Sequence, residues 1–152
     1  MNKFYYKYNI HNFKFTIAQI DDCITTITLD DLTLDYECQE TKLIKKTKQE
    51  LTEYFNKERE HFDIKIKLTG SAFQNKVWTK MLEIPYGETI SYKDLAVKLG
   101  NKNYARAVGN ACHKNKLLIL VPCHRVIGKK DIGGFYYDIN IKKEFLKIEE
   151  IN

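Results

Sequence analysis

The sequence lacks any apolar run approaching the length of about twenty residues that spans a membrane as a helix. It also lacks a signal-peptide pattern, because Asn2–Lys7 mixes polar and aromatic residues where an apolar segment would stand. We therefore expect a soluble, cytoplasmic protein without membrane contact. Zinc-site spacings and C-x-x-C pairs are absent too, so we predict no metal site, no disulfide framework and no cofactor. The four cysteines are widely scattered: Cys23, Cys38, Cys112 and Cys123.

Basic side chains are missing from residues 21–40, a segment with seven acids, whereas residues 76–130 carry eleven Lys and Arg against three acids. The net charge of +5 thus combines an acidic N-terminal part with a basic C-terminal part. Clustered Lys and Arg attract phosphates at any sequence, so the basic part points to a polyanionic partner. The ordinary alternative is a solvated charged face.

Strand and helix patterns divide the chain into two expected domains, residues 1–68 and 69–152. Aromatic and β-branched residues predict a small antiparallel sheet in the first domain, and apolar residues at helical spacing predict one amphipathic helix. The fold class is therefore α/β (α+β), with a sheet-plus-helix domain before a mostly helical one. The expected elements of the first domain are strands over residues 4–10, 13–18 and 24–29, a helix over 41–58, and a strand or extended linker over 62–68.

The second domain has the signals of a helix-turn-helix. Ser71–Gln74 fits a capping box, and the helix that it opens should end at Pro85–Gly87. Ser91 should open a second helix that stops at Gly100, and Asn103 can cap a third. Two short helices joined by so tight a turn are typical of DNA-binding helix-turn-helix proteins. A last helix is expected over residues 139–150.

The third of these helices, residues 104–112, is unusual for its small side chains. Small residues permit tight helix packing, which is the plain explanation. They also permit close approach to a nucleic-acid groove, with Arg106 projecting into it.

A thiol and an imidazole follow the apolar run Leu117–Val121, which we expect to be a buried strand stopped by Pro122. A histidine beside Cys123 could raise the population of its thiolate, the reactive form, so this pair is a candidate activated nucleophile. The alternative is a buried structural cysteine beside a surface histidine.

Taken together, these segments resemble the O6-alkylguanine-DNA alkyltransferases over roughly residues 73–150; the N-terminal part fits that family only in outline. The pentapeptide Pro122–Val126 is highly specific when it follows a helix-turn-helix with Arg-Ala-Val-Gly. The motifs that carry the resemblance are Ile90–Tyr92, Ala105–Gly109, Asn115, Pro122–Val126 and Gly134–Tyr136.

The resemblance implies a winged helix-turn-helix repair protein that binds double-stranded DNA containing O6-alkylguanine as a monomer. The modified base would be flipped out and its alkyl group transferred irreversibly to Cys123, with O4-alkylthymine left open as a second substrate. His124 and Glu150 would form a water-bridged relay with the thiol, Tyr92 would donate to guanine N3, and Asn115 would tie the helix-turn-helix to the active-site turn.

The resemblance also implies residues for binding. A backbone N–H near Tyr137 would donate to guanine O6. Arg125 has a plain alternative role as a buried ion-pair partner. The implied DNA-binding residues are Tyr92, Ala105, Arg106, Ala107, Gly109 and Arg125, and those of the substrate pocket are Val126, Tyr136 and Tyr137.

Two departures from the family pattern concern the loop and the hinge. Tyr137-Asp138-Ile139 stands where small residues and glycines are usual, and Lys116 replaces an expected proline after Asn115.

Two other functions compete with alkyl transfer. One is a non-catalytic module that binds alkylguanine DNA, against which Cys123 argues because such relatives typically carry tryptophan there. The other is a winged-helix regulator, which needs no Cys-His pair.

Overall fold

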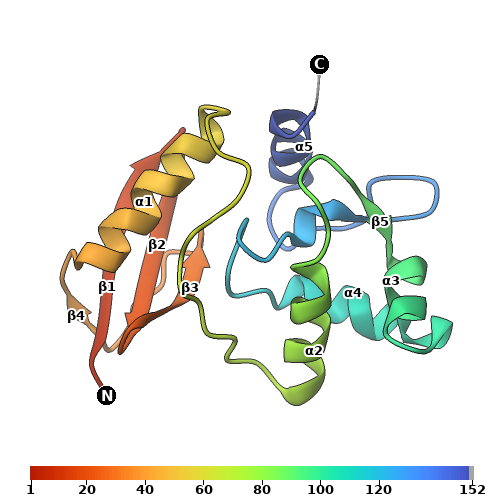
Figure 1. Ribbon diagram of the computed structural model, residues 1–152, viewed down its shortest axis with the longest axis horizontal. Coiled ribbons are helices and arrows are strands. Elements are labelled where there is room, and N and C mark those ends of the chain that lie inside the picture. Colours follow the sequence, from red (N-terminus) through yellow and green to blue (C-terminus); the bar gives the residue numbers. More distant parts are fainter. Residues whose placement is uncertain (151–152) are drawn as a thin grey trace. The chain divides into compact units, whose positions relative to one another are not determined.

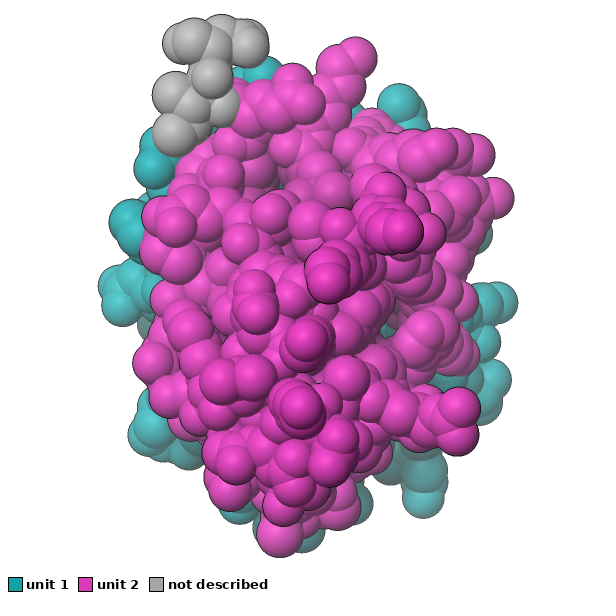
Figure 2. Space-filling model, turned by 90° about the vertical axis from the view of Figure 1, so that its right-hand side faces the viewer, with its two compact units in different colours: residues 1–69, 116–118 teal, residues 70–115, 119–152 magenta. Residues whose placement is uncertain are grey.

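The computed structural model describes residues 1–150, which fall into two compact units, coloured separately in Figure 2. Unit 1 comprises residues 1–69 and 116–118; unit 2 comprises residues 70–115 and the chain from Ile119 onward. Leu117 joins unit 1 because it bridges to Ile27, with Ile27 N donating to Lys116 O at 2.8 Å. Within residues 1–150, no helix is both long and apolar enough to cross a membrane.

A four-stranded sheet forms unit 1, in the order β3-β2-β1-β4 (Figure 1). The three predicted strands are confirmed, and β1–β2 and β2–β3 are antiparallel as expected. The sheet is nevertheless mixed, because the short β4 pairs in parallel with β1. The segment predicted as a strand or linker over residues 62–68 is extended, with one isolated bridge from Ile66 to Ile24. The strands are β1 Lys3–Ile10, β2 Phe13–Ile20, β3 Cys23–Thr28 and β4 Glu37–Cys38.

Helix α1, Lys42–Phe55, lies across β1 and β2 (Figure 1). Thr41 caps it by accepting from Ile44 N at 3.0 Å, which satisfies one of the free N–H groups of the first turn. Its apolar stripe meets the inward side chains of the sheet, because the helical and strand periodicities each direct one apolar face inward. The fully buried core of this unit includes Phe15, Ile17, Ile24, Ile27, Ile44, Leu51 and Tyr54.

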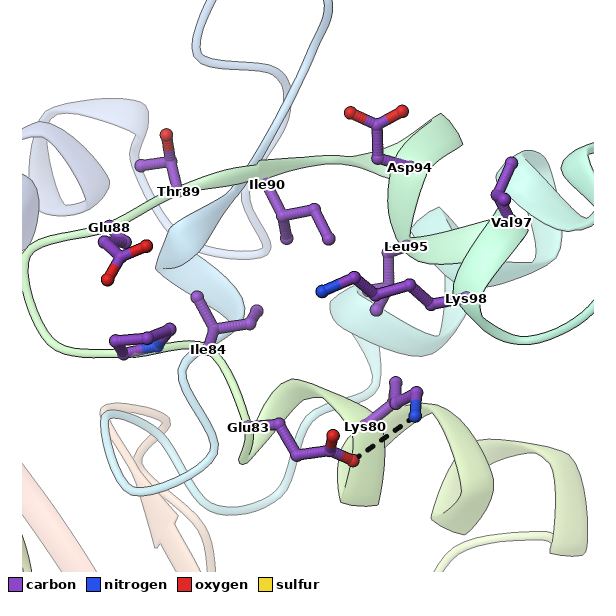
Figure 3. Close-up of a pocket in the computed structure, with 11 residues that line it drawn as sticks. Lys80, Glu83, Ile84, Glu88, Thr89, Ile90, Asp94, Leu95, Val97 and Lys98 are labelled. Atoms are coloured by element: carbon purple, nitrogen blue, oxygen red, sulfur yellow. Dashed lines mark ion pairs between the residues drawn. The ribbon is translucent and has the colours of Figure 1, made fainter.

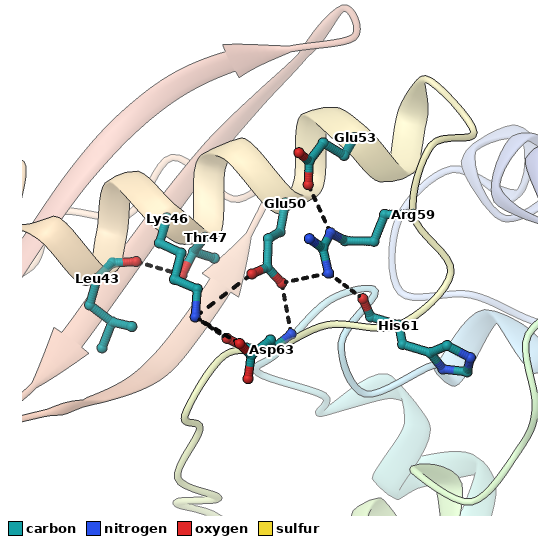
Figure 4. A network of polar contacts seen from close by, with 8 residues as sticks. All are labelled: Leu43, Lys46, Thr47, Glu50, Glu53, Arg59, His61 and Asp63. Carbon is teal, nitrogen blue, oxygen red and sulfur yellow. Dashed lines mark hydrogen bonds and ion pairs between the residues drawn. The ribbon is translucent and has the colours of Figure 1, made fainter.

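A network of charged side chains fastens the segment after α1 to the helix (Figure 4). Its centre is Glu50, which is only 3% exposed and accepts from Asp63 N at 2.8 Å. Arg59 lies 3.5 Å from the same carboxylate and also donates to Glu53 at 2.8 Å. The buried Glu50 charge is therefore matched by a guanidinium and a backbone donor, as a buried carboxylate requires.

Up to residue 150, unit 2 contains four helices, two short 3₁₀ turns and one two-stranded pairing. Ser71 and Gln74 form the predicted capping box of α2. Trp78 of α2 donates its indole N–H to Ala111 O at 2.9 Å, which ties α2 to α4 inside the core. The elements are α2 Ala72–Met81, β5 Ile90–Ser91, α3 Tyr92–Lys98, η1 Lys102–Tyr104, α4 Ala105–His113, η2 Cys123–Arg125, β6 Val126–Ile127 and α5 Ile139–Ile148.

The predicted helix-turn-helix is formed by α3 and α4. Ser91 caps α3 by accepting from Asp94 N, and Gly100 ends it with φ +107°, a conformation that favours glycine. The predicted cap at Asn103 is wrong. Asn101 accepts from Asn103 N at 2.9 Å, and a 3₁₀ turn at residues 102–104 leads into α4.

The apolar run before Cys123 is buried as predicted, but it is not a strand. Ile119 has φ +73°, a left-handed conformation that a β-branched residue rarely adopts, and the chain turns there. Only isolated bridges flank this turn. The run therefore fills the core while changing direction immediately before the Cys-His pair.

Candidate active site

Cys123 is the first residue of η2 and follows the turn at Ile119–Leu120 by three residues. Its side chain is 5% exposed, and burial raises the pKa of its thiol. A thiol in such surroundings becomes a nucleophile only if neighbouring groups stabilise the thiolate or take its proton.

Asn115 supplies the first such group. Its side-chain amide donates to Val121 O at 2.8 Å and to Cys123 Sγ at 3.2 Å. The bond to sulfur lowers the pKa of Cys123, acting against burial. Asn115 follows α4 at the end of the helix-turn-helix, so one amide joins this helix to the active-site turn.

His124 is fully buried, and its Nε2 lies 2.5 Å from Glu149 Oε2. Burial lowers the pKa of His124 although the hydrogen bond to Glu149 acts to raise it, so the imidazole is neutral near pH 7. Since Glu149 also accepts from Arg125, we assign the proton to Nε2 as the donor to this carboxylate. Nδ1 then keeps its lone pair, and it has no hydrogen-bond partner within residues 1–150.

The sequence predicts Glu150 as the carboxylate of the relay with His124. This prediction is wrong, because the structure places Glu149 against His124 and leaves Glu150 exposed. The reason is helical spacing. Glu149 lies four residues after Phe145 and seven after Lys142, which places it on their buried face. Glu150 is one residue further and faces outward.

Arg125 was predicted to bind DNA, and this prediction is wrong. Its side chain is buried, donating to Glu149 Oε1 at 2.7 Å and Oε2 at 3.2 Å and to Ile84 O at 2.8 Å. Its guanidinium also lies 5.6 Å from the Tyr86 ring centroid. Arg125 therefore has the alternative role of a buried ion-pair partner, in which it orients the carboxylate that holds His124.

Tyr92 opens α3 and faces three glycines. A β-carbon on Gly133 would lie 2.8 Å from the Tyr92 ring, and one on Gly109 would just reach it at 4.0 Å. Its hydroxyl donates to Gly134 O at 3.4 Å. Burial, followed by the nearby Cys112 and Cys123 thiols, raises the pKa of Tyr92 to about 12, so the hydroxyl keeps its proton at neutral pH.

The small-residue helix α4 presents its polar side to solvent. Arg106 and Ala107 are exposed, Ala105 and Gly109 are partly exposed, and Val108 is buried. Arg106 has no hydrogen-bond or ion-pair partner in the part of the chain that the structure describes. The exposed side of α4 thus carries small side chains together with the long cationic side chain of Arg106.

The predicted pocket residues differ in exposure. Val126 is fully buried on β6, where it pairs with Ile90, so its side chain belongs to the core. Tyr136 is 55% exposed, and Tyr137 is partly buried with its ring 4.9 Å from that of Tyr136. Asp138 caps α5 by accepting from Asn140 N at 2.8 Å, which directs its carboxylate to the helix start.

Two buried charged residues escaped sequence reasoning: Lys142 on α5 and Glu149 at the C-cap of this helix. Glu149 and Lys142 are charged residues on an otherwise apolar helical face. Helical spacing from Phe145, three residues back and four residues on, places both on the buried face of this segment.

A surface cavity of about 440 Å³ lies elsewhere in unit 2 (Figure 3). Ile84, Ile90 and Leu95 line it together with charged side chains, among them the ion pair Lys80–Glu83 at 3.5 Å. It contains neither Cys123 nor Tyr92, and no thiol or imidazole lines it. This cavity therefore has no candidate nucleophile, whereas η2 carries Cys123.

Comparison with known proteins relates the chain to one family. Residues 72–151 match the model described as "6-O-methylguanine DNA methyltransferase, DNA binding domain". A constitutive methylated-DNA–protein-cysteine methyltransferase of Bacillus subtilis is 40% identical over 146 residues, covering 90% of this chain and 88% of its own length. A probable methylated-DNA–protein-cysteine methyltransferase of Acanthamoeba polyphaga mimivirus is 43% identical over 112 residues, covering 73% of this chain and 75% of its own length.

The fold has a solved counterpart. The crystal structure of Mycobacterium tuberculosis OGT in complex with DNA superposes with a TM-score of 0.90 at 33% identity, over 97% of this chain and 92% of that one. The fold described above, a mixed sheet with one helix and a mostly helical unit, is thus shared with a protein that was crystallised in complex with DNA.

Proposed function

Since the chain belongs to the 6-O-methylguanine DNA methyltransferase family, we propose that Cys123 accepts the alkyl group of O6-alkylguanine from duplex DNA in a single, irreversible turnover. The protein is a methylated-DNA–protein-cysteine methyltransferase of DNA repair, and DNA is its partner. The observation that carries the assignment of the nucleophile is the Cys123 thiol, held by Asn115 next to a neutral, buried histidine whose Nδ1 has no partner among residues 1–150.

The thiolate would form by proton transfer to His124. A water molecule between Cys123 Sγ and His124 Nδ1 would carry the proton, because Nε2 is occupied by Glu149 and Nδ1 retains its lone pair. Glu149 orients the imidazole and stabilises the imidazolium that forms. The Asn115 amide remains as a donor to the sulfur, so it favours the thiolate over the thiol.

Transfer would then proceed by in-line displacement. The thiolate attacks the alkyl carbon, a C–S bond forms, and the C–O6 bond breaks with its electron pair going to the guanine. Tyr92 is a protonated donor that can hydrogen-bond guanine N3 as negative charge develops on the base, and a backbone N–H near Tyr137 would do so at O6. The proton that left the thiol is finally returned to the guanine.

DNA would dock on α4. The partly exposed Ala105 and Gly109 allow a groove to approach the helix, and Arg106 would occupy the space of the extruded base. Basic side chains around this helix, including His113 and Lys114 at its end, supply contacts to the phosphates. We propose that one copy of the chain binds one lesion.

The direct test is a single incubation with duplex DNA containing O6-methylguanine, followed by intact-protein mass. We expect a gain of one methyl group, mapped to Cys123, and no gain in Cys123→Ala, which should bind the same duplex nearly as well. Binding of the lesion without a mass gain would instead support the non-catalytic module. Binding without preference for the lesion would support a regulator.

Arg106 can be tested with two substrates. Arg106→Ala should slow repair of a stacked duplex lesion far more than reaction with the free O6-alkylguanine base, since only the duplex requires a side chain in place of the extruded base. Lys102→Ala, on the exposed turn before α4, is the charge-matched control. Equal losses on both substrates would remove Arg106 from this role.

A further inference from the structure

The turn at residues 85–88 lies between α2 and β5 and contacts the end of α5. Glu88 N closes this turn by donating to Pro85 O at 3.1 Å. None of its side chains takes part in the transfer chemistry proposed above. Two of its residues, Tyr86 and Gly87, nevertheless bind α5 through hydrogen bonds. A connection between two elements does not require such contacts, which points to a second role for this turn.

Gly87 completes the hydrogen bonding of the Glu149 carboxylate. Its N–H donates to Glu149 Oε1 at 3.3 Å, and the same oxygen accepts from Arg125 Nε at 2.7 Å. The other oxygen lies against His124 Nε2 and accepts from Arg125 Nη2 at 3.2 Å. Gly87 has φ +81°, a conformation that favours glycine. Each carboxylate oxygen is thus held by two groups, one of which comes from the turn.

Tyr86 binds both the backbone that carries this carboxylate and the arginine that pairs with it. Its hydroxyl donates to Ile148 O at 3.3 Å, the carbonyl of the peptide bond that leads to Glu149. This carbonyl lies in the last turn of α5, where no helical N–H is available to it. The Tyr86 ring lies 5.6 Å from the Arg125 guanidinium, within the range of a cation–π contact. One half-buried side chain therefore fastens two neighbours of the carboxylate.

The place of Glu149 in the chain explains why such contacts matter. Glu149 is the C-cap of α5, and its N–H donates to Phe145 O at 3.2 Å. Helix ends open far more readily than helix centres, so contacts from outside the helix determine how firmly this residue is held. If its carboxylate moves away from His124 Nε2, it no longer fixes the tautomer in which Nδ1 can receive the thiol proton.

We propose that Tyr86 is a positioning residue for alkyl transfer. Together with Gly87, it holds the end of α5 so that Glu149 stays within hydrogen-bond reach of His124. This role deepens the proposed function and rests on the proton relay through His124. Tyr86 itself transfers no proton. The plain alternative is that the turn only contributes packing, which would affect stability but not the state of the imidazole.

A double-mutant cycle with Glu149 tests this role. Tyr86→Leu removes both the hydroxyl and the ring, and we expect it to slow single-turnover methyl transfer about tenfold, less than the roughly 100-fold that a displacement of about 1 Å can cost. In the Glu149→Gln background the same change should have almost no further effect, because residues that act through one another are not additive. The O6-methylguanine duplex is kept saturating so that DNA affinity does not enter the rate. An equal loss in both backgrounds overturns the proposal.

The tautomer of His124 gives a readout that does not depend on transfer. NMR of nitrogen-labelled protein should show Nε2 protonated and Nδ1 unprotonated, with the signals assigned by their loss in His124→Gln. Tyr86→Leu should move the two ring-nitrogen signals toward each other, because the second tautomer becomes populated. Unchanged signals in the folded variant overturn the proposal, even where transfer is slower.

Two further variants complete the test. Tyr86→Phe keeps the ring and removes only the bond to Ile148 O, so both readouts should fall between wild type and Tyr86→Leu; it replaces Tyr86→Leu if that variant does not fold. Tyr8→Phe, which removes a tyrosine bond to Glu40 in unit 1, is the matched control and should behave as wild type. If wild type shows no methyl gain while the Tyr86 variants still change the His124 signals, the proposed function fails and the positioning role of Tyr86 stands.

Discussion

Each unit of this protein buries one glutamate, and the two networks differ in what surrounds the carboxylate. Glu50 in unit 1 is 3% exposed and Glu149 in unit 2 is 2% exposed. Each lies against an arginine and accepts from a backbone N–H, of Asp63 in one case and of Gly87 in the other. The stabilising chemistry is therefore the same.

The difference lies in the remaining partner. Glu50 is approached by the lysine side chain of Lys46 at 3.9 Å, and its network ends in loop backbone (Figure 4). Glu149 instead holds the neutral His124, next in sequence to a buried thiol. A buried carboxylate thus fixes a loop in one unit and fixes a histidine tautomer in the other, and only the second arrangement has a consequence for proton transfer.

The largest contrast should appear in the rate of methyl transfer. Glu149→Gln should slow transfer to Cys123 by roughly 100-fold or more, since the imidazole loses the acceptor that fixes its tautomer and stabilises its protonated form. Glu50→Gln should leave the rate per folded molecule unchanged. Single-turnover kinetics on an O6-methylguanine duplex, at a temperature where both variants are folded, measures this.

Glu150→Gln, one residue beyond the C-cap of α5, is the matched control. It is exposed and should behave as wild type, whereas the relay expected from the sequence requires it to resemble Glu149→Gln. A slow Glu150→Gln beside a normal Glu149→Gln would restore the sequence-based assignment and contradict the geometry.

The sequence predicted well those features that depend on local chemistry. The capping residues Ser71 and Ser91 and the glycine that ends α3 were recognisable because capping and left-handed backbone demand particular side chains. The family resemblance implied that Asn115 ties the helix-turn-helix to the turn at Cys123, and its amide donates to Val121 O and Cys123 Sγ.

What the sequence did not predict depends on tertiary partners. Lys142 can face inward because it donates to Val126 O and Gly134 O, and Glu149 because it pairs with Arg125 and His124. No local sequence pattern reveals such partners. The apolar run before Cys123 resembled a strand because burial alone produces the same composition, whereas the left-handed Ile119 turns the chain. The DNA-binding role of Arg125 was implied by the family resemblance, and the structure instead agrees with the alternative stated for it, a buried ion pair.

The second contrast concerns stability. Arg125→Met leaves Glu149 and Ile84 O without their guanidinium in a buried site and should lower the free energy of unfolding by about 3–5 kcal/mol. Arg59→Met should cost clearly less, because the Arg59 side chain is 30% exposed and solvent can replace part of its interaction with Glu50. Urea unfolding of the two variants and wild type gives the comparison. Equal losses would mean that the two networks are equivalent in energy as well as in composition.

The smallest contrast is in the response to acid, and it isolates His124. Burial lowers the pKa of His124 in the folded protein, so below its ordinary value of about 6.5 the unfolded chain binds a proton that the folded protein excludes. Stability from this group is complete above that pH and is lost as the pH falls, by up to about 1.4 kcal/mol for each pH unit until the folded pKa is reached.

His124→Gln keeps an N–H donor for Glu149 and cannot titrate in this range, so its unfolding free energy should fall less between pH 7 and pH 5 than that of wild type. Glu50→Gln should lose stability at both pH values and keep the wild-type slope, because it weakens the contacts with Lys46 and Arg59 but leaves His124 in its buried site. Urea unfolding at pH 7, 6 and 5 measures both slopes. A His124→Gln slope as steep as that of wild type would show that the acid sensitivity arises outside the Glu149 network, and the neutral imidazole would then lose its support as the base that receives the Cys123 proton.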